Sequence, residues 1–224
     1  MKILVFGASG MVGQGVLREC LRATDVADVR AVGRSASGLQ HPKLSELAHA
    51  DLLDWGGAQA QLQGYDACFF CLGVSAGGMT EAQYTRVTHD MTLVVATALV
   101  RVNSAMTFIY VSGAGTDSTA HGRSMWARVK GRTENALMRL PFKAVYLFRP
   151  GIIVPLDGIR SKTRAYRLFY SLTRPIWPLV MPLLPNLVAT TRSIGLAMLE
   201  AARHGAPQPI LEVADIATLS RRRG

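Results

Sequence analysis

Cysteine is scarce in this sequence of 224 residues, which contains only three. A small disulfide-based scaffold is therefore excluded. Cys68 and Cys71 form a CxxC pattern, but they lie in the run DACFFCLG, which is typical of a buried strand. Residues three apart on a strand point to opposite faces, so these two thiols are poorly placed to share a zinc ion or a disulfide. We interpret both, with Cys20, as packing residues in a reducing compartment, and we expect no metal site.

Acidic residues are also scarce: 15 Asp and Glu stand against 25 Lys and Arg, which gives a formal net charge of +10. The excess is local, because no acidic residue lies between Asp157 and Glu200, whereas six basic residues do. Such an excess indicates an acidic partner or a small anionic substrate, and a solvated basic face explains it equally well. No nucleic-acid-binding motif accompanies it.

Long hydrophobic runs are absent as well. The apolar run that follows Lys2 stops at Gly7 and is far too short for the apolar region of a signal peptide. The longest uncharged run, between Arg174 and Arg192, is shorter than the roughly 20 residues that a spanning helix needs. Four prolines also interrupt it. We therefore expect no transmembrane helix and a cytoplasmic location.

The sequence does contain a regular alternation of short apolar runs and helical stretches, which is typical of a doubly wound parallel sheet. The apolar runs are rich in branched residues, so we expect helices on both faces of the sheet. The predicted strands cover 2–7, 28–33, 67–73, 106–112, 144–150 and 209–213, with a weaker candidate at 44–47. The predicted helices cover 12–23, 56–63, 80–102, 124–140, 160–173 and 191–204. We predict a single α/β domain over residues 1–224.

The segment 156–190 follows the last main strand and differs from the rest in composition. It is basic at its start and proline-rich over 175–185. We expect it to form a small lid on the substrate side of the domain or a subunit contact. An alternative is that 160–189 lies on a membrane surface, with arginines meeting anionic lipid and apolar groups dipping inward. A buried lid or dimer surface is the preferred interpretation.

A glycine-rich loop follows the first predicted strand directly. The run GASGMVG places Gly7, Gly10 and Gly13 in the spacing GxxGxxG, with Ser9, Met11 and Val12 between them. In a Rossmann-type fold the first glycine permits the turn, the second lets the backbone approach a pyrophosphate, and the third lets the helix pack on the sheet. The helix N-terminus then faces the phosphates. The sequence therefore predicts a Rossmann-type dinucleotide site.

The residues after the second predicted strand indicate which dinucleotide binds. A protein that prefers NAD commonly places an acidic residue there to hold the ribose hydroxyls. This sequence has Arg34 and Ser35 instead. A guanidinium suits a 2′-phosphate, which it can bind through two hydrogen bonds, so NADP(H) is favoured over NAD(H). Asp51 and Leu52, in the run ADLLDW, are predicted to meet the adenine.

These motifs, in this order, give the chain a resemblance to a known superfamily. GASGMVG at the start, GRS after the second strand, DLLD, CLG, VSGAG, VKG and FRPG are similar to the atypical short-chain dehydrogenase/reductase superfamily, in its NAD(P)-binding, epimerase-like branch. The resemblance covers roughly residues 1–155. It implies the fold and the cofactor and does not name a substrate.

The resemblance also implies roles for individual residues. Ser112 matches the serine that orients the substrate oxygen, and Lys130 matches the lysine that holds the ribose and lowers the pKa of a catalytic tyrosine. Leu72 and Gly73 match the turn after the third main strand. Arg149, Pro150, Gly151 and Ile152 match the segment that passes beside the nicotinamide.

The position of the catalytic tyrosine holds Trp126, which is placed one helical turn before Lys130 on the same helix face. An indole N–H donates a hydrogen bond but cannot deliver a proton at physiological pH. Two readings follow: an NADP(H)-dependent oxidoreductase or epimerase-like enzyme, or a catalytically silent NADP(H)-binding sensor or partner-binding protein. Possible substitute donors are Ser124, His121, Tyr84 and His89, for which surface or core roles are better supported.

Overall fold

The computed structural model describes residues 1–36, 38–159 and 187–222. The expected helix at 160–173, the proline-rich stretch 175–185 and most of the expected lid therefore lie outside the described residues. Within the described ranges, no helix is long and apolar enough to cross a membrane.

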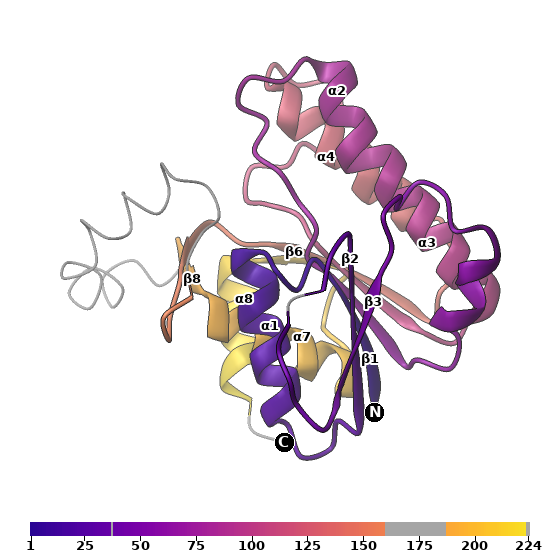
Figure 1. Cartoon of the computed structure of the whole chain (residues 1–224). Helices are drawn as coiled ribbons and strands as arrows, with labels where there is room; N and C mark the ends of the chain where they lie inside the picture. The colour runs from indigo at the N-terminus through magenta and orange to yellow at the C-terminus, as the bar shows by residue number, and fades with distance from the viewer. Residues whose placement is uncertain (37, 160–186, 223–224) are drawn as a thin grey trace.

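The described residues form a seven-stranded sheet in which every neighbouring pair is parallel (Figure 1). Its strand order is β3-β2-β1-β4-β5-β6-β9. The strands are β1 (Lys2–Phe6), β2 (Asp28–Gly33), β3 (Leu44–Ala48), β4 (Ala67–Phe70), β5 (Thr107–Val111), β6 (Ala144–Arg149) and β9 (Ile210–Glu212). This order confirms the predicted Rossmann-type α/β fold. The strand order reverses between β1 and β4, and ligands of such sheets bind at that point, outside the carboxyl ends of the strands.

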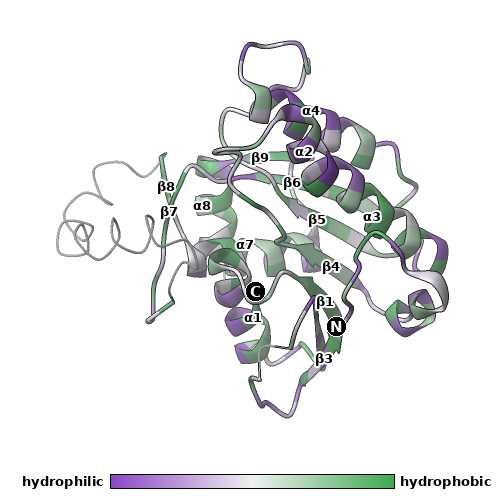
Figure 2. Cartoon of the chain, turned by 45° about the horizontal axis from the view of Figure 1, so that its top comes forward, coloured by the Kyte–Doolittle hydropathy of each residue, from purple (hydrophilic) through white to green (hydrophobic). Residues whose placement is uncertain are grey.

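Helices cover both faces of the sheet, as predicted. On one face lie α1 (Met11–Arg22), α7 (Thr191–His204) and α8 (Val213–Arg221), and on the other lie η1 (Gly56–Leu62), α3 (Met91–Val102) and α4 (Met125–Leu137) (Figure 1). Alternate residues of β1 divide between the two cores: Ile3 and Val5 pack with α1 and α7, whereas Leu4 and Phe6 pack with η1 and α3. Figure 2 shows the sheet as predominantly hydrophobic between helices of mixed character.

The same alternation separates the two cysteines of the CxxC pattern. Cys68 lies in the core on the α3 face, and Cys71 packs against the core on the α1 face. The prediction that the two thiols point apart is confirmed. Burial raises the pKa of the Cys71 thiol, so it stays protonated and apolar in character.

Several element boundaries differ from the predicted ones. The helix expected over 80–102 consists of α2 (Glu81–Thr85), a π-helical turn η2 (Arg86–Asp90) and α3, and the helix expected at 56–63 is the 3₁₀ helix η1. The strand expected over 67–73 ends at Phe70, because the chain leaves the sheet at its carboxyl edge. Three elements were not predicted: β7 (Ile152–Val154) and β8 (Val188–Thr190), which pair with each other, and α8. The weak strand candidate at 44–47 is confirmed as β3.

Candidate functional site

The glycine loop turns sharply from β1 into α1. Gly7 has φ +78°, in the left-handed region, and a Cβ on it would lie 2.9 Å from the Leu72 amide nitrogen. A Cβ on Gly13 would lie 2.1 Å from the Gly7 carbonyl oxygen, so only glycine lets α1 begin so close to the strand. A Cβ on Gly10 would meet only the Gly7 carbonyl oxygen, at 3.3 Å. The space over Gly10 is therefore open, as a pyrophosphate group requires.

The structure gathers the predicted cofactor-binding residues at the carboxyl ends of neighbouring strands. Arg34 and Ser35 are exposed after β2, and Leu52 is buried after β3. Beside it, the Asp51 carboxylate accepts a hydrogen bond from the Leu53 amide at 2.9 Å. The others follow β1, β4 or β6: Ser9, Met11, Val12, Leu72, Gly73, Pro150 and Gly151. Ile152 begins β7, with 46% of its surface exposed.

Ser112 follows β5 directly and is buried. Its hydroxyl oxygen lies 3.1 Å from that of Thr116, and the Thr116 hydroxyl donates to the Gly113 carbonyl oxygen at 2.7 Å. Because the Thr116 proton is directed at Gly113, Ser112 is the donor in the pair. The Ser112 amide donates to the Phe148 carbonyl oxygen at 2.7 Å, which fixes the turn against β6. The serine is thus held at the carboxyl edge of the sheet, two strands from the glycine loop.

Lys130 extends from α4 over the aromatic ring of Tyr110, with its Nζ atom 5.3 Å from the ring centre. Tyr110 is fully buried in β5, and burial raises its pKa far above the usual range. Burial also lowers the pKa of Lys130 to about 8, and the carboxylate of Glu134 partly opposes that shift. Sequence reasoning missed Tyr110; its position two residues before Ser112 on the same face of β5 was the available signal.

Trp126 packs against the turn that follows Ser112. A Cβ on Gly115 would lie 3.5 Å from Cη2 of the indole, and one on Gly113 would lie 4.0 Å from Cζ3. The sequence placed this ring beside the Lys130 ammonium; the ring under the ammonium is instead that of Tyr110. Trp126 therefore covers the loop of the candidate catalytic serine, where small glycines leave it room.

The residues considered as substitute proton donors do not form an alternative site. Tyr84 is only 2% exposed, and burial raises its pKa. His89 Nδ1 lies 2.9 Å from a carboxylate oxygen of Asp90 on the outer side of η2. His121 is exposed, and Ser124 caps α4 without a side-chain hydrogen bond.

Arg149, which was matched to the segment beside the nicotinamide, belongs to a buried ion-pair network instead. Its guanidinium donates to both carboxylate oxygens of Glu134, which is 1% exposed. It also donates to the Ser118 hydroxyl at 2.6 Å and to Glu212 at 3.2 Å. These hydrogen bonds raise the pKa of Arg149, so the group is charged at every accessible pH. The network ties β6, α4 and β9 together behind the site.

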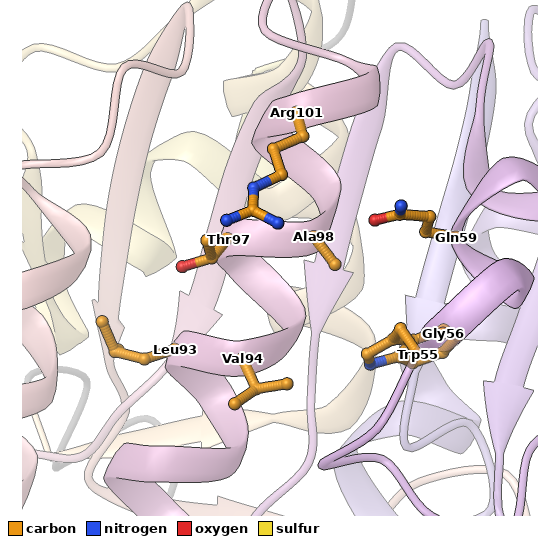
Figure 3. Close-up of a pocket in the computed structure, with 8 residues that line it drawn as sticks. All are labelled: Trp55, Gly56, Gln59, Leu93, Val94, Thr97, Ala98 and Arg101. Carbon is orange, nitrogen blue, oxygen red and sulfur yellow. The ribbon is translucent and has the colours of Figure 1, made fainter.

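Among the described residues, two pockets lie on opposite faces of the sheet. One, of about 470 Å³, lies between η1 and α3 (Figure 3). It is lined by Trp55, Gly56 and Gln59 on one side and by Leu93, Val94, Thr97, Ala98 and Arg101 of α3 on the other. The other, of about 690 Å³, lies beside the glycine loop and α1. Since α1 and α3 cover opposite faces of the sheet, the two pockets are separate, and only the second adjoins the predicted cofactor site.

Residues 7–139, which are more than half of the chain, match a family model described as NAD(P)H-binding. The chain belongs to the NAD(P)H-binding family. The matched range contains the glycine loop, Ser112, Trp126 and Lys130. The match confirms the NAD(P)-binding part of the predicted resemblance.

Among curated proteins, the chain is similar to the protein named "Protein fmp52-2, mitochondrial" of Aspergillus oryzae. The two are 29% identical over 97% of this chain and 96% of that protein. Similar solved structures include WbmF of Bordetella bronchiseptica with NAD⁺ (TM-score 0.65, 17% identity, 97% of this chain and 76% of that chain). UDP-glucuronic acid 4-epimerase from Bacillus cereus with NAD is also similar (TM-score 0.65, 13% identity, 94% and 76%). At these identities the structures show a shared fold alone.

The names of the curated relatives correct one expectation. Members from Aspergillus oryzae, Chaetomium globosum and Saccharomyces cerevisiae are named as mitochondrial proteins. These names contradict the predicted cytoplasmic location of this chain. The lack of a secretory apolar region and of a spanning helix does not distinguish the cytoplasm from the mitochondrion.

The lowered pKa of Lys130 makes a prediction for stability. Between its folded pKa of about 8 and its usual value near 10.5, the unfolded chain binds more protons than the folded one, so stability rises with pH in this window. We expect a gain of about 1–2 kcal/mol from pH 7 to pH 9.5 in the free energy of unfolding. Urea denaturation of the wild type and a Lys130→Met variant measures it. Between pH 7 and pH 9.5 the unfolding free energy of the variant should rise by about 1–2 kcal/mol less than that of the wild type. The same pH dependence in both proteins would contradict the buried position of the ammonium.

Proposed function

We propose that this protein is an NADP(H)-dependent oxidoreductase of the short-chain dehydrogenase/reductase kind, acting on a small carbonyl or hydroxyl substrate. The observation that carries the proposal is the convergence of the open glycine loop, the buried Ser112 hydroxyl and the Lys130 ammonium at one edge of the sheet. That the substrate is anionic rests on the sequence alone, because the basic stretch 160–174 lies outside the described residues.

The residues of this chain divide the work as follows. The nicotinamide, when bound, supplies or accepts a hydride. Ser112 orients the substrate oxygen through its hydroxyl group, whose own partner, Thr116, can be exchanged for the substrate. With a pKa of about 8, Lys130 is mostly protonated at neutral pH and donates to the ribose hydroxyls. Trp126 closes the loop side and excludes water.

Trp126 makes slow turnover part of the proposal. Loss of a positioned acid commonly lowers a rate by about 10²–10⁴-fold. We therefore expect weak activity in which water or the substrate itself supplies the proton. A catalytically silent sensor is the alternative suggested by the tryptophan, and it is not favoured, because the serine and the lysine keep the arrangement that chemistry requires.

The preference for NADP(H) is supported by the residues after β2. No acidic side chain occupies the end of this strand, where one would hold ribose hydroxyls, and Arg34 with Ser35 stands there instead. A cation at this point favours the 2′-phosphate of NADP(H). It cannot accept the hydrogen bonds that an aspartate would accept from the free ribose hydroxyls of NAD(H).

Fluorescence titration with NADPH and NADH tests cofactor binding directly. We expect the wild type to bind NADPH more tightly than NADH. In a Gly10→Ala variant the added methyl group fills the open space over the loop, and the affinity for both cofactors should fall at least about 10-fold. Gly57→Ala is the matched control, since a Cβ on Gly57 meets nothing within 4 Å. A wild type that binds neither cofactor would contradict the proposed function.

A further inference from the structure

The pocket beside the glycine loop contains charged groups that the sequence did not connect with the cofactor. It is lined by Ser9 of the loop and by Ser35 after β2, so it begins where the adenine ribose of a dinucleotide is expected. Arg18 and Arg22 line it from α1, and Asp157 lines it from the turn after β7. Arg34 is exposed and does not line this pocket among the residues that the structure describes.

The two arginines have different partners. Arg18 Nη1 lies 2.8 Å from Asp157 Oδ2 and 3.5 Å from the Asp157 carbonyl oxygen, and the two side chains are 33% and 37% exposed. Arg22 pairs within its own helix, 3.4 Å from a carboxylate oxygen of the buried Glu19. Arg18 is therefore the cation of this wall whose partner belongs to another element and can be reached by a small anion.

Asp157 is held in place independently of Arg18. The Leu156 amide donates to the Thr191 hydroxyl at 3.2 Å, and the Ile159 amide donates to the Leu156 carbonyl oxygen at 3.1 Å, which fixes the turn at the start of α7. Asp157 has φ +59°, a left-handed conformation that Asp and Asn tolerate better than other residues with a side chain. Its carboxylate can therefore lose Arg18 while the turn persists.

We propose that Arg18 holds the 2′-phosphate of NADP(H), and that Asp157 occupies the Arg18 guanidinium until this phosphate enters the pocket. The inference rests on the proposed function and adds a residue that selects the cofactor. A phosphate carries about two negative charges and accepts two parallel hydrogen bonds from a guanidinium. A partly exposed ion pair such as that between Arg18 and Asp157 contributes little free energy, so the phosphate displaces the carboxylate. Asp157 thereby lowers the affinity for NADP(H) and leaves that for NAD(H) unaffected.

Binding titrations of two charge-removing variants test both halves of the proposal. Arg18→Gln should weaken NADPH binding by about 10-fold and change NADH binding by less than about twofold. Asp157→Asn, which suits the left-handed turn, should tighten NADPH binding by about 2–5-fold and leave NADH binding unchanged. The tightening should vanish when both changes are combined. Arg101→Gln, which removes an equal charge on the opposite face of the sheet, is the control and should alter neither affinity.

A second ligand pair isolates the phosphate from the nicotinamide. Arg18→Gln should weaken the binding of adenosine 2′,5′-bisphosphate and leave the binding of adenosine 5′-monophosphate unchanged. If the wild type prefers NADPH and Arg18→Gln keeps that preference, Arg18 is not the phosphate ligand. If Asp157→Asn changes the affinities for NADPH and NADH equally, or changes neither, Asp157 does not compete with the 2′-phosphate for Arg18. A wild type that binds no dinucleotide would instead contradict the proposed function itself.

Discussion

A Trp126→Tyr variant is expected to reduce a carbonyl substrate about 10²–10⁴-fold faster than the wild type, because it restores a positioned proton donor. The position lies one helical turn before Lys130, on the same face of α4, and the present indole lies over the turn that follows Ser112. Loss of NADPH absorbance with a panel of small aldehydes and ketones measures the rate.

Trp126→Phe is the matched control, since it loses nearly the same ring volume and gains no hydroxyl. We expect it to stay at the wild-type rate, and we expect the gain in Trp126→Tyr to disappear when Ser112→Ala is added. If Trp126→Tyr binds NADPH and is no faster than Trp126→Phe, the proton donor does not limit this site, and the proposed oxidoreductase activity loses its support.

The second large effect concerns the ion pair behind the site. A Glu134→Ala variant is expected to lose about 3–5 kcal/mol of unfolding free energy, because it leaves the Arg149 guanidinium buried without its main partner. Glu134 is 1% exposed, and the remaining carboxylate, that of Glu212, has a side chain 49% exposed. Urea denaturation monitored by circular dichroism measures the loss.

Asp25→Ala is the control for this measurement, because it breaks a comparable pair with Arg203 at the surface, where the Asp25 side chain is 49% exposed. It should cost less than about 1 kcal/mol. Replacing Glu134 and Arg149 together by methionine should recover most of the stability, since the uncompensated charge is gone. Equal losses in the Glu134 and Asp25 variants would show that the network contributes no more than a surface ion pair.

The resemblance to known motifs supplied Ser112 and Lys130, whereas the sequence by itself determined the sheet and the dinucleotide loop. These features depend on short-range rules: apolar runs that alternate with helices, glycines at the turns that follow a strand, and side chains at fixed places on a strand or helix. The physical constraint on Gly13 is set by Gly7 and Ala8, only a few positions away, so the pattern GxxGxxG carries it. The space beside Gly7 is limited instead by the Leu72 amide, which reaches the loop only when the sheet has formed.

Only the tertiary structure decided which side chains meet. Arg18 and Asp157 are 139 residues apart in the chain, and Arg149 lies 63 residues from Glu212. Such pairs depend on the order in which the strands assemble, and no local pattern records that order. For the same reason Tyr110, and not Trp126, lies under the Lys130 ammonium: the strand that carries it passes beneath α4 only once the sheet has formed.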